Sequence, residues 1–109
     1  MTDNQFCALY TDALSSNDRD AFASDWALSP MWGEGADLIS TAGLCGRVWD
    51  LAHLSVADVR HHAGLSQSEF ARRFCIPYHT VKNWEARGGC APYLILLLSR
   101  ACGMTKGVL

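Results

Sequence analysis

Several features are scarce or missing in this sequence of 109 residues, and each excludes a class of protein. The longest unbroken apolar run, Tyr93 to Leu98, has six residues, whereas a membrane span needs roughly twenty. No cationic start followed by an apolar core occurs at residues 1–10, so no signal peptide is expected. A soluble, cytoplasmic protein that does not enter a membrane is therefore expected.

The cysteines form no Cys-x-x-Cys pair, which argues against a zinc site or a redox motif, and no metal or other cofactor is expected. They lie singly in or beside apolar helical patterns, where a free thiol behaves as a small hydrophobic side chain. We expect all five to be buried and reduced: Cys7, Cys45, Cys75, Cys90 and Cys102.

Catalytic signatures are also missing. The sequence has no Gly-x-Ser-x-Gly, no Gly-Lys-Ser/Thr phosphate loop and no glycine fingerprint for a dinucleotide. Cys75 and His79 are four residues apart, but no third group is evident that would orient them. The chain is therefore not expected to be an enzyme.

Charge is divided unequally along the chain, although the formal net charge is only −2. Residues 1–58 hold two basic and nine acidic side chains, a charge of −7, whereas residues 59–109 hold seven basic and two acidic ones, a charge of +5. Such asymmetry is typical of a protein whose basic half faces a nucleic acid. Chance segregation of solvated charges is the alternative.

Apolar residues recur at helical spacing throughout, and no segment alternates like a strand, so the fold class is predicted to be all-α. The second helix is expected to begin after an N-cap at Asn17 and to end before Pro30. Ser66 and Glu69 form a capping box, Gly64 is a natural stop, and Pro77 suits a helix start. The other helices are expected over 4–14, 36–52 (with Leu38, Ala42, Cys45, Trp49 and Ala52 as its apolar face), 55–63, 67–74, 77–86 and 92–101.

The segment from Leu65 to Glu85 resembles the helix-turn-helix of the XRE-type (Cro/phage repressor-like) family. The positions that carry the resemblance are Gln67, Ala71, Val81, Trp84 and Glu85. It implies a five-helix repressor-like helix-turn-helix DNA-binding domain over residues 54–109. Residues 1–53 would then be an acidic N-terminal helical extension for dimerisation or partner binding.

The resemblance also implies a function, that of a sequence-specific DNA-binding transcriptional regulator, a repressor, which acts as a homodimer on double-stranded DNA. The helix from Pro77 to Ala86 would enter the major groove. Its base-contacting residues would be Tyr78, His79 and Asn83. The phosphate-contacting residues would be Gln67, Thr80, Lys82, Arg72, Arg73 and Arg87.

Two positions depart from the family pattern. Cys75 occupies a turn position where the family has glycine, so it is expected either to adopt a left-handed conformation or to shift the turn. Ala86, Arg87 and Gly88 follow Glu85, where the family often places glycine directly.

Other interpretations stay open. Tyr78 could pack beneath its helix, His79 and Asn83 could be idle, and Arg72 and Arg73 could be merely solvated. His61 and His62 are interpreted as surface residues. The alternative function is a protein-interaction module or antitoxin-like adaptor, which keeps the helix-turn-helix scaffold and binds a protein through the acidic N-terminal helices.

Overall fold

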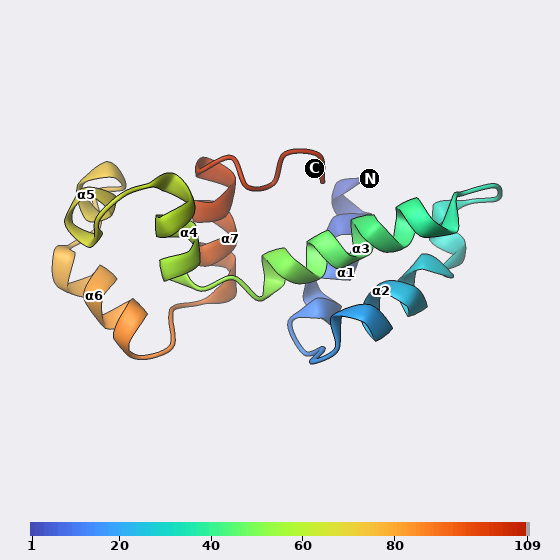
Figure 1. Cartoon of the computed structure of the whole chain (residues 1–109), viewed down its shortest axis with the longest axis horizontal. Helices are drawn as coiled ribbons and strands as arrows, with labels where there is room; N and C mark the ends of the chain where they lie inside the picture. Colours follow the sequence, from blue (N-terminus) through green and yellow to red (C-terminus); the bar gives the residue numbers. More distant parts are fainter. Residues whose placement is uncertain (109) are drawn as a thin grey trace. The chain divides into compact units, whose positions relative to one another are not determined.

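The computed structural model describes residues 1–108, which are all-helical (Figure 1). Within these residues there is no strand, as the sequence predicts, and no helix is both long and apolar enough to cross a membrane. The elements are α1 (Asp3–Ala13), α2 (Arg19–Ala27), the short 3-10 helix η1 (Pro30–Trp32), α3 (Leu38–Ala52), α4 (Val56–Ala63), α5 (Gln67–Arg73), α6 (Tyr78–Ala86) and α7 (Pro92–Ala101).

The chain forms two compact units. The first contains Met1–His53 together with the described residues from Thr105 onward, and the second contains Leu54–Met104. The sequence-based division assigned residues 105–109 to the second segment. The structure instead places the described part of this tail with the first unit, where the Arg47 guanidinium donates to the Lys106 carbonyl at 2.7 Å and Val108 is buried.

The first unit consists of α1, α2 and α3, with α3 packed against both other helices. Asp18, not the predicted Asn17, caps α2, because its carboxylate accepts the Ala21 amide at 3.1 Å. A carboxylate there also complements the positive end of the helix dipole, which a neutral asparagine does not. The core side chains of this unit are Phe6, Leu9, Tyr10, Ala13, Phe22, Ala23, Ala27, Cys45, Val48, Leu51 and Val108.

Gly46 in α3 gives the long side chain of Arg19 room to cross from α2. A Cβ at Gly46 would lie only 2.8 Å from the Arg19 Nη2 atom. Arg19 in turn forms a bidentate ion pair with Asp50, at 2.8 and 3.0 Å. The glycine that lowers the helical propensity of α3 therefore permits a tie between α2 and α3.

The second unit has four α-helices, one fewer than the expected five, because the described residues after Ala101 adopt turns and form no further helix. Side chains from α4, α5 and α6 form its core: Val56, Val59, Phe70, Ala71 and Val81. Ile95 and Leu98 of α7 pack against this cluster. Every helix in the unit thus contributes one face to the core.

Two of the predicted helix-end signals in the second unit are confirmed. Ser66 and Glu69 form a complete capping box at α5, and Gly64 ends α4 in a left-handed conformation. Cys75 does the same after α5, with φ at +54°. The Ile76 amide donates to the Ala71 carbonyl at 2.9 Å, and the Cys75 amide to Arg72 at 3.4 Å. This is the Schellman pattern of hydrogen bonds, with cysteine where glycine is usual.

The expectation that all cysteines are buried is confirmed only for Cys45 and was plainly wrong for Cys7 and Cys75. Cys45 is buried and Cys90 and Cys102 are half-buried, but Cys7 and Cys75 are exposed. Cys7 lies on the outer face of α1, and the left-handed turn directs Cys75 to solvent. Desolvation raises the pKa of the Cys45, Cys90 and Cys102 thiols.

Replacing Cys75 with glycine should raise the free energy of unfolding by up to about 1 kcal/mol. The left-handed conformation costs an L-residue about 1–2 kcal/mol, and part of the gain is offset by the extra entropy of glycine in the unfolded chain. Urea unfolding monitored by circular dichroism measures the change. Cys75→Ala is the matched control, because it removes the thiol and keeps the strained φ. Equal midpoints for the two variants would show that the strain is absent.

Candidate nucleic-acid interface

The helix α6 has two chemically distinct sides. Val81 is buried in the core, and Thr80, Trp84 and Glu85 are half-buried beside it. The other side is exposed and carries Tyr78, His79, Lys82, Asn83 and Ala86. At 3.6 residues per turn these five positions occupy about 140° of the helix circumference. The three predicted base-contacting residues therefore share one accessible face.

The connection between α5 and α6 is short and closed by backbone hydrogen bonds. Ala71 is buried on α5, where its small side chain permits a close approach of the two helices. Pro77 precedes α6 as its N-cap, without a side-chain hydrogen bond, and not as its first helical residue. Its carbonyl accepts the Thr80 amide at 2.9 Å. Local geometry thus leaves the first turn of α6, with Tyr78 and His79, free of capping side chains.

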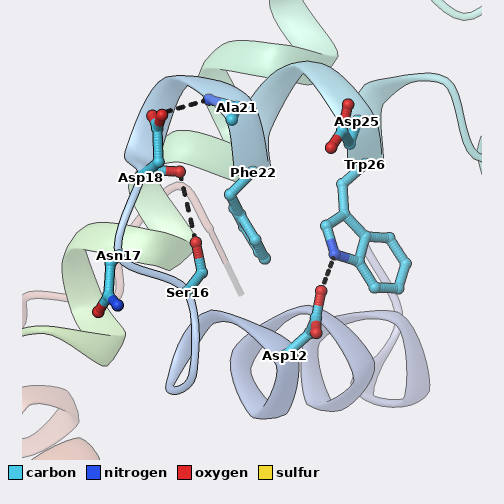
Figure 2. A pocket seen from close by; sticks show the side chains of 8 residues that line it. All are labelled: Asp12, Ser16, Asn17, Asp18, Ala21, Phe22, Asp25 and Trp26. Atoms are coloured by element: carbon cyan, nitrogen blue, oxygen red, sulfur yellow. Dashed lines mark hydrogen bonds between the residues drawn. The ribbon is translucent and has the colours of Figure 1, made fainter.

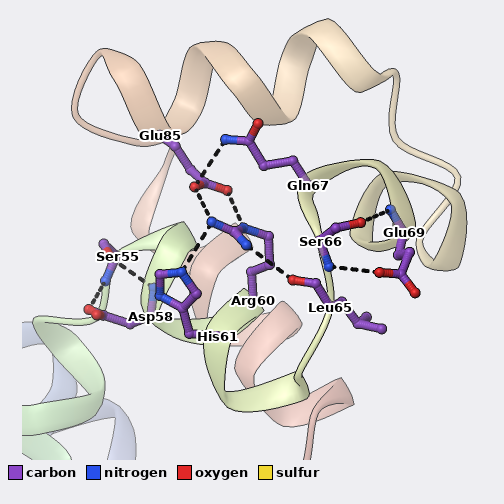
Figure 3. Close-up of polar contacts among 9 residues, drawn as sticks. All are labelled: Ser55, Asp58, Arg60, His61, Leu65, Ser66, Gln67, Glu69 and Glu85. Carbon is purple, nitrogen blue, oxygen red and sulfur yellow. Dashed lines mark hydrogen bonds and ion pairs between the residues drawn. The ribbon is translucent and has the colours of Figure 1, made fainter.

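A polar network joins α4, α5 and α6 (Figure 3). Arg60 of α4 forms a bidentate ion pair with Glu85 of α6, with Nε–Oε2 at 2.8 Å and Nη2–Oε1 at 2.9 Å. Gln67 of α5 donates its side-chain amide to the same carboxylate at 3.2 Å. The third nitrogen, Arg60 Nη1, donates to the Leu65 carbonyl at 3.1 Å. The network fixes α6 relative to the two preceding helices.

His61 adds one further contact to Arg60. Its Nε2 lies 3.2 Å from Arg60 Nη2. Since a guanidinium can only donate, this contact requires His61 Nε2 to accept. His61 and His62 are both exposed, as predicted. Within the described residues no group of three or more side chains could hold a metal ion.

The ion pair is shielded from water, with side-chain exposures of 14% for Arg60 and 11% for Glu85. The hydrogen bonds from Arg60 lower the pKa of Glu85, partial burial opposes this, and Gln67 adds to the lowering. The same pair raises the pKa of Arg60. Both groups are therefore charged at neutral pH.

Tyr78 and Lys82 contact one another on the exposed face. The Lys82 Nζ lies 5.5 Å from the centre of the Tyr78 ring, a cation–π distance. The two side chains are one helical turn apart, so the contact forms within α6 itself. Tyr78 is 48% exposed, so it is not packed beneath its helix.

The predicted phosphate-contacting residues are placed differently from one another. Lys82, Arg72, Arg73 and Arg87 are exposed, and Arg72 donates back along α5 to the Ser68 hydroxyl at 2.8 Å. Thr80 and Gln67 are half-buried. The amide nitrogen of Gln67 is already bound to Glu85, so this residue supports α6 from within.

Sequence analysis missed the role of Arg60, which it counted only as a charge. The resemblance singled out Glu85 and Gln67, but Arg60 lies 25 residues before Glu85. No helical spacing relates two such positions. The available signal was that a half-buried carboxylate on a core-facing side of a helix needs a cationic partner.

Comparisons of the chain with protein-family models, with curated proteins and with solved structures find no match.

Glu85→Ala should lower the free energy of unfolding by about 3 kcal/mol, because it leaves a shielded guanidinium without its partner. Asp50→Ala is the matched control. It removes an ion pair with side-chain exposures of 42% and 52%, for which a loss of at most about 1 kcal/mol is expected. Chemical unfolding of both variants measures the difference. Equal losses would contradict a special role for the shielded pair.

Acid should weaken the second unit through the same carboxylate. Because the pKa of Glu85 is lowered on folding, its stabilising contribution is present above the unfolded value, about 4.3, and is lost as the pH falls through the lower folded value. The free energy of unfolding, measured from pH 6 to pH 3, should therefore decrease less steeply in Glu85→Gln than in the native chain. Parallel curves would show that Glu85 does not contribute.

Proposed function

We propose that the chain binds double-stranded DNA in a sequence-specific manner through α6 and acts as a transcriptional regulator, a repressor. The observation that carries the proposal is the sidedness of α6, a helix anchored on one face and presenting Tyr78, His79, Lys82 and Asn83 on the other. In this proposal α5 and α6 form a helix-turn-helix of the XRE type. A helix of this width fits the major groove of B-form DNA.

The exposed side chains suit the edges of base pairs. Asn83 can form two hydrogen bonds with adenine, and Tyr78 and His79 can donate or accept at neighbouring bases. Lys82 suits a phosphate as a point charge. Ala86, at the end of the same face, is small enough to let the helix approach the groove closely.

Charge supports the proposal independently. The second unit holds six basic and three acidic side chains. All three acids are occupied within the unit, since Asp58 and Glu69 close capping boxes and Glu85 pairs with Arg60. Arg72, Arg73 and Arg87 are exposed and would attract phosphates, with Thr80 and Gln67 as shorter-range contacts.

A homodimer is the assembly that fits this function. Two copies related by a twofold axis would present two α6 helices to half-sites about one helical turn, roughly 34 Å, apart. The bound operator would accordingly be palindromic.

The second candidate function, a protein-interaction module or antitoxin-like adaptor, concerns the first unit. The observation that favours it is the exposure of Leu28 and Ile39 there. Large apolar side chains grouped on a surface are typical of binding sites. The two functions are compatible because they use different units.

Asn83→Ala should weaken binding to the selected duplex by about 1–3 kcal/mol and relax the preference at one base pair. Lys82→Ala should weaken binding to all duplexes alike. It should also reduce the salt dependence of binding by the equivalent of about one phosphate contact. The duplex is selected from a random pool at fixed salt. Fluorescence anisotropy then measures the affinity of the native chain and of each variant for it.

The matched controls are Asn4→Ala and Lys106→Ala, which remove an exposed amide and an exposed ammonium from the first unit. Neither should alter binding. If Asn83→Ala and Lys82→Ala also leave DNA binding unchanged, α6 is not the helix that contacts the DNA. If no duplex is enriched from the pool, sequence-specific binding is rejected.

A further inference from the structure

An apolar groove lies between α2 and α3 in the first unit. It has a volume of about 310 Å³ and is lined by Ser24, Ala27, Leu28, Leu38, Ile39 and Ala42. Of the residues that line the groove, Leu28 is 71% exposed and Ile39 is 84% exposed, so both side chains are open to solvent. Neither contributes to the core of the unit. A ligand that covered these side chains would remove apolar surface from water, which favours binding.

A second hollow, of about 400 Å³, lies on the other side of α2 (Figure 2). Three carboxylates line it, from Asp12 of α1, from Asp18 at the start of α2 and from Asp25. The Trp26 indole, which donates to Asp12 at 2.7 Å, and Phe22 form its apolar wall. This hollow is therefore acidic, whereas the groove is apolar.

One exposed ridge of α2 separates the two hollows. Ala21, Asp25 and Leu28 follow one another at spacings of four and three residues, so they lie along the same side of the helix. Ala21 and Asp25 line the acidic hollow, and Leu28 lines the apolar groove. A ligand lying on this ridge would meet carboxylates on one side and leucine and isoleucine on the other.

The ionisable side chains of residues 20–46, which include most of α2 and the start of α3, have one sign. Residues 20–46 include Asp20, Asp25, Glu34 and Asp37 and no lysine, arginine or histidine. Hydrogen bonds from Ser40 lower the pKa of Asp37, which keeps this carboxylate ionised beside Leu38. Such a surface attracts a cationic ligand and repels an anionic one.

We propose that this surface, formed by the apolar groove and the acidic hollow, binds a basic amphipathic helix of a partner protein. The apolar residues of that helix, at i, i+3 or i+4 and i+7, would fill the groove beside Leu28 and Ile39. The lysines or arginines of that helix would reach across α2 to Asp25 and to the other carboxylates that line the acidic hollow. The inference concerns the first unit alone and does not depend on DNA binding by the second.

A second copy of this chain fits the surface less well. It would bring the carboxylates of Asp25, Glu34 and Asp37 against the same three carboxylates of the other copy. The large exposed apolar side chains here are only Leu28, Leu38 and Ile39, whereas a stable interface between two globular proteins uses roughly 20–30 residues on each side. A single helix needs far less surface.

The test uses the full chain and a labelled synthetic peptide of about 18 residues, built from leucine and lysine with leucine on one helical face. Fluorescence anisotropy should show binding with a dissociation constant roughly in the micromolar range. The binding should weaken as the salt concentration rises. Leu28→Ser and Ile39→Ser should each weaken it about tenfold or more. Asp25→Asn should weaken it a few-fold and reduce its salt dependence.

Matched variants control for general effects. Leu97→Ser removes an exposed leucine from the second unit, and Asp3→Asn removes an exposed carboxylate outside both hollows. Both should bind the peptide like the native chain. Circular dichroism and thermal melting establish that the groove variants remain folded, which their exposed positions favour.

Three results would overturn the proposal. The peptide could fail to bind the native chain, or a scrambled peptide of the same composition could bind equally, which would indicate charge attraction alone. Sedimentation could instead show a dimer of the native chain that Ile39→Ser dissociates, which would make a second copy the occupant. DNA binding measured on the same variants separates these failures from a failure of the proposed function.

Discussion

The pairing of Arg60 with Glu85 is the constraint on which the second unit depends. A helix of nine residues without a side-chain N-cap is marginal by itself. It is held by Val81 in the core and by a carboxylate that reaches back to α4 and α5. Because these contacts all lie on one side, the residues on the other side are not needed for folding. That separation leaves Tyr78, His79 and Asn83 available to a ligand.

Much of the local structure could be predicted, because caps and turns depend on residues three or four positions apart. The capping box at Ser66 and the stop at Gly64 are of this kind. Even the strain at Cys75 follows locally, since the turn needs a left-handed residue and the sequence supplies no glycine. The exposed face of α6 follows from the helical period once Val81 is assigned to the core.

Contacts between distant residues could not be predicted in this way. Arg60 and Glu85 are 25 residues apart, and Arg19 reaches Asp50 across 31. The apolar face expected for α3 was also displaced, because its pattern allows two registers. Leu38 was assigned to that face but is exposed, whereas Val48 and Leu51 are buried with Cys45. Packing against α1 and α2 selects the register, and helical period alone does not.

The two proposals are linked through charge. The first unit holds three basic and eight acidic side chains, a formal charge of −5, and any part of it near a phosphate backbone opposes binding. If bound DNA brings phosphates within a Debye length, about 8 Å, of the surface between α2 and α3, a cationic helix on that surface would neutralise part of the charge and raise the affinity of the same chain for DNA. Thermodynamic reciprocity then requires DNA to raise the affinity for the helix by the same factor. Because such coupling is electrostatic, it should vanish at high salt, whereas the apolar contacts of Ile39 with the helix should be much less sensitive to salt.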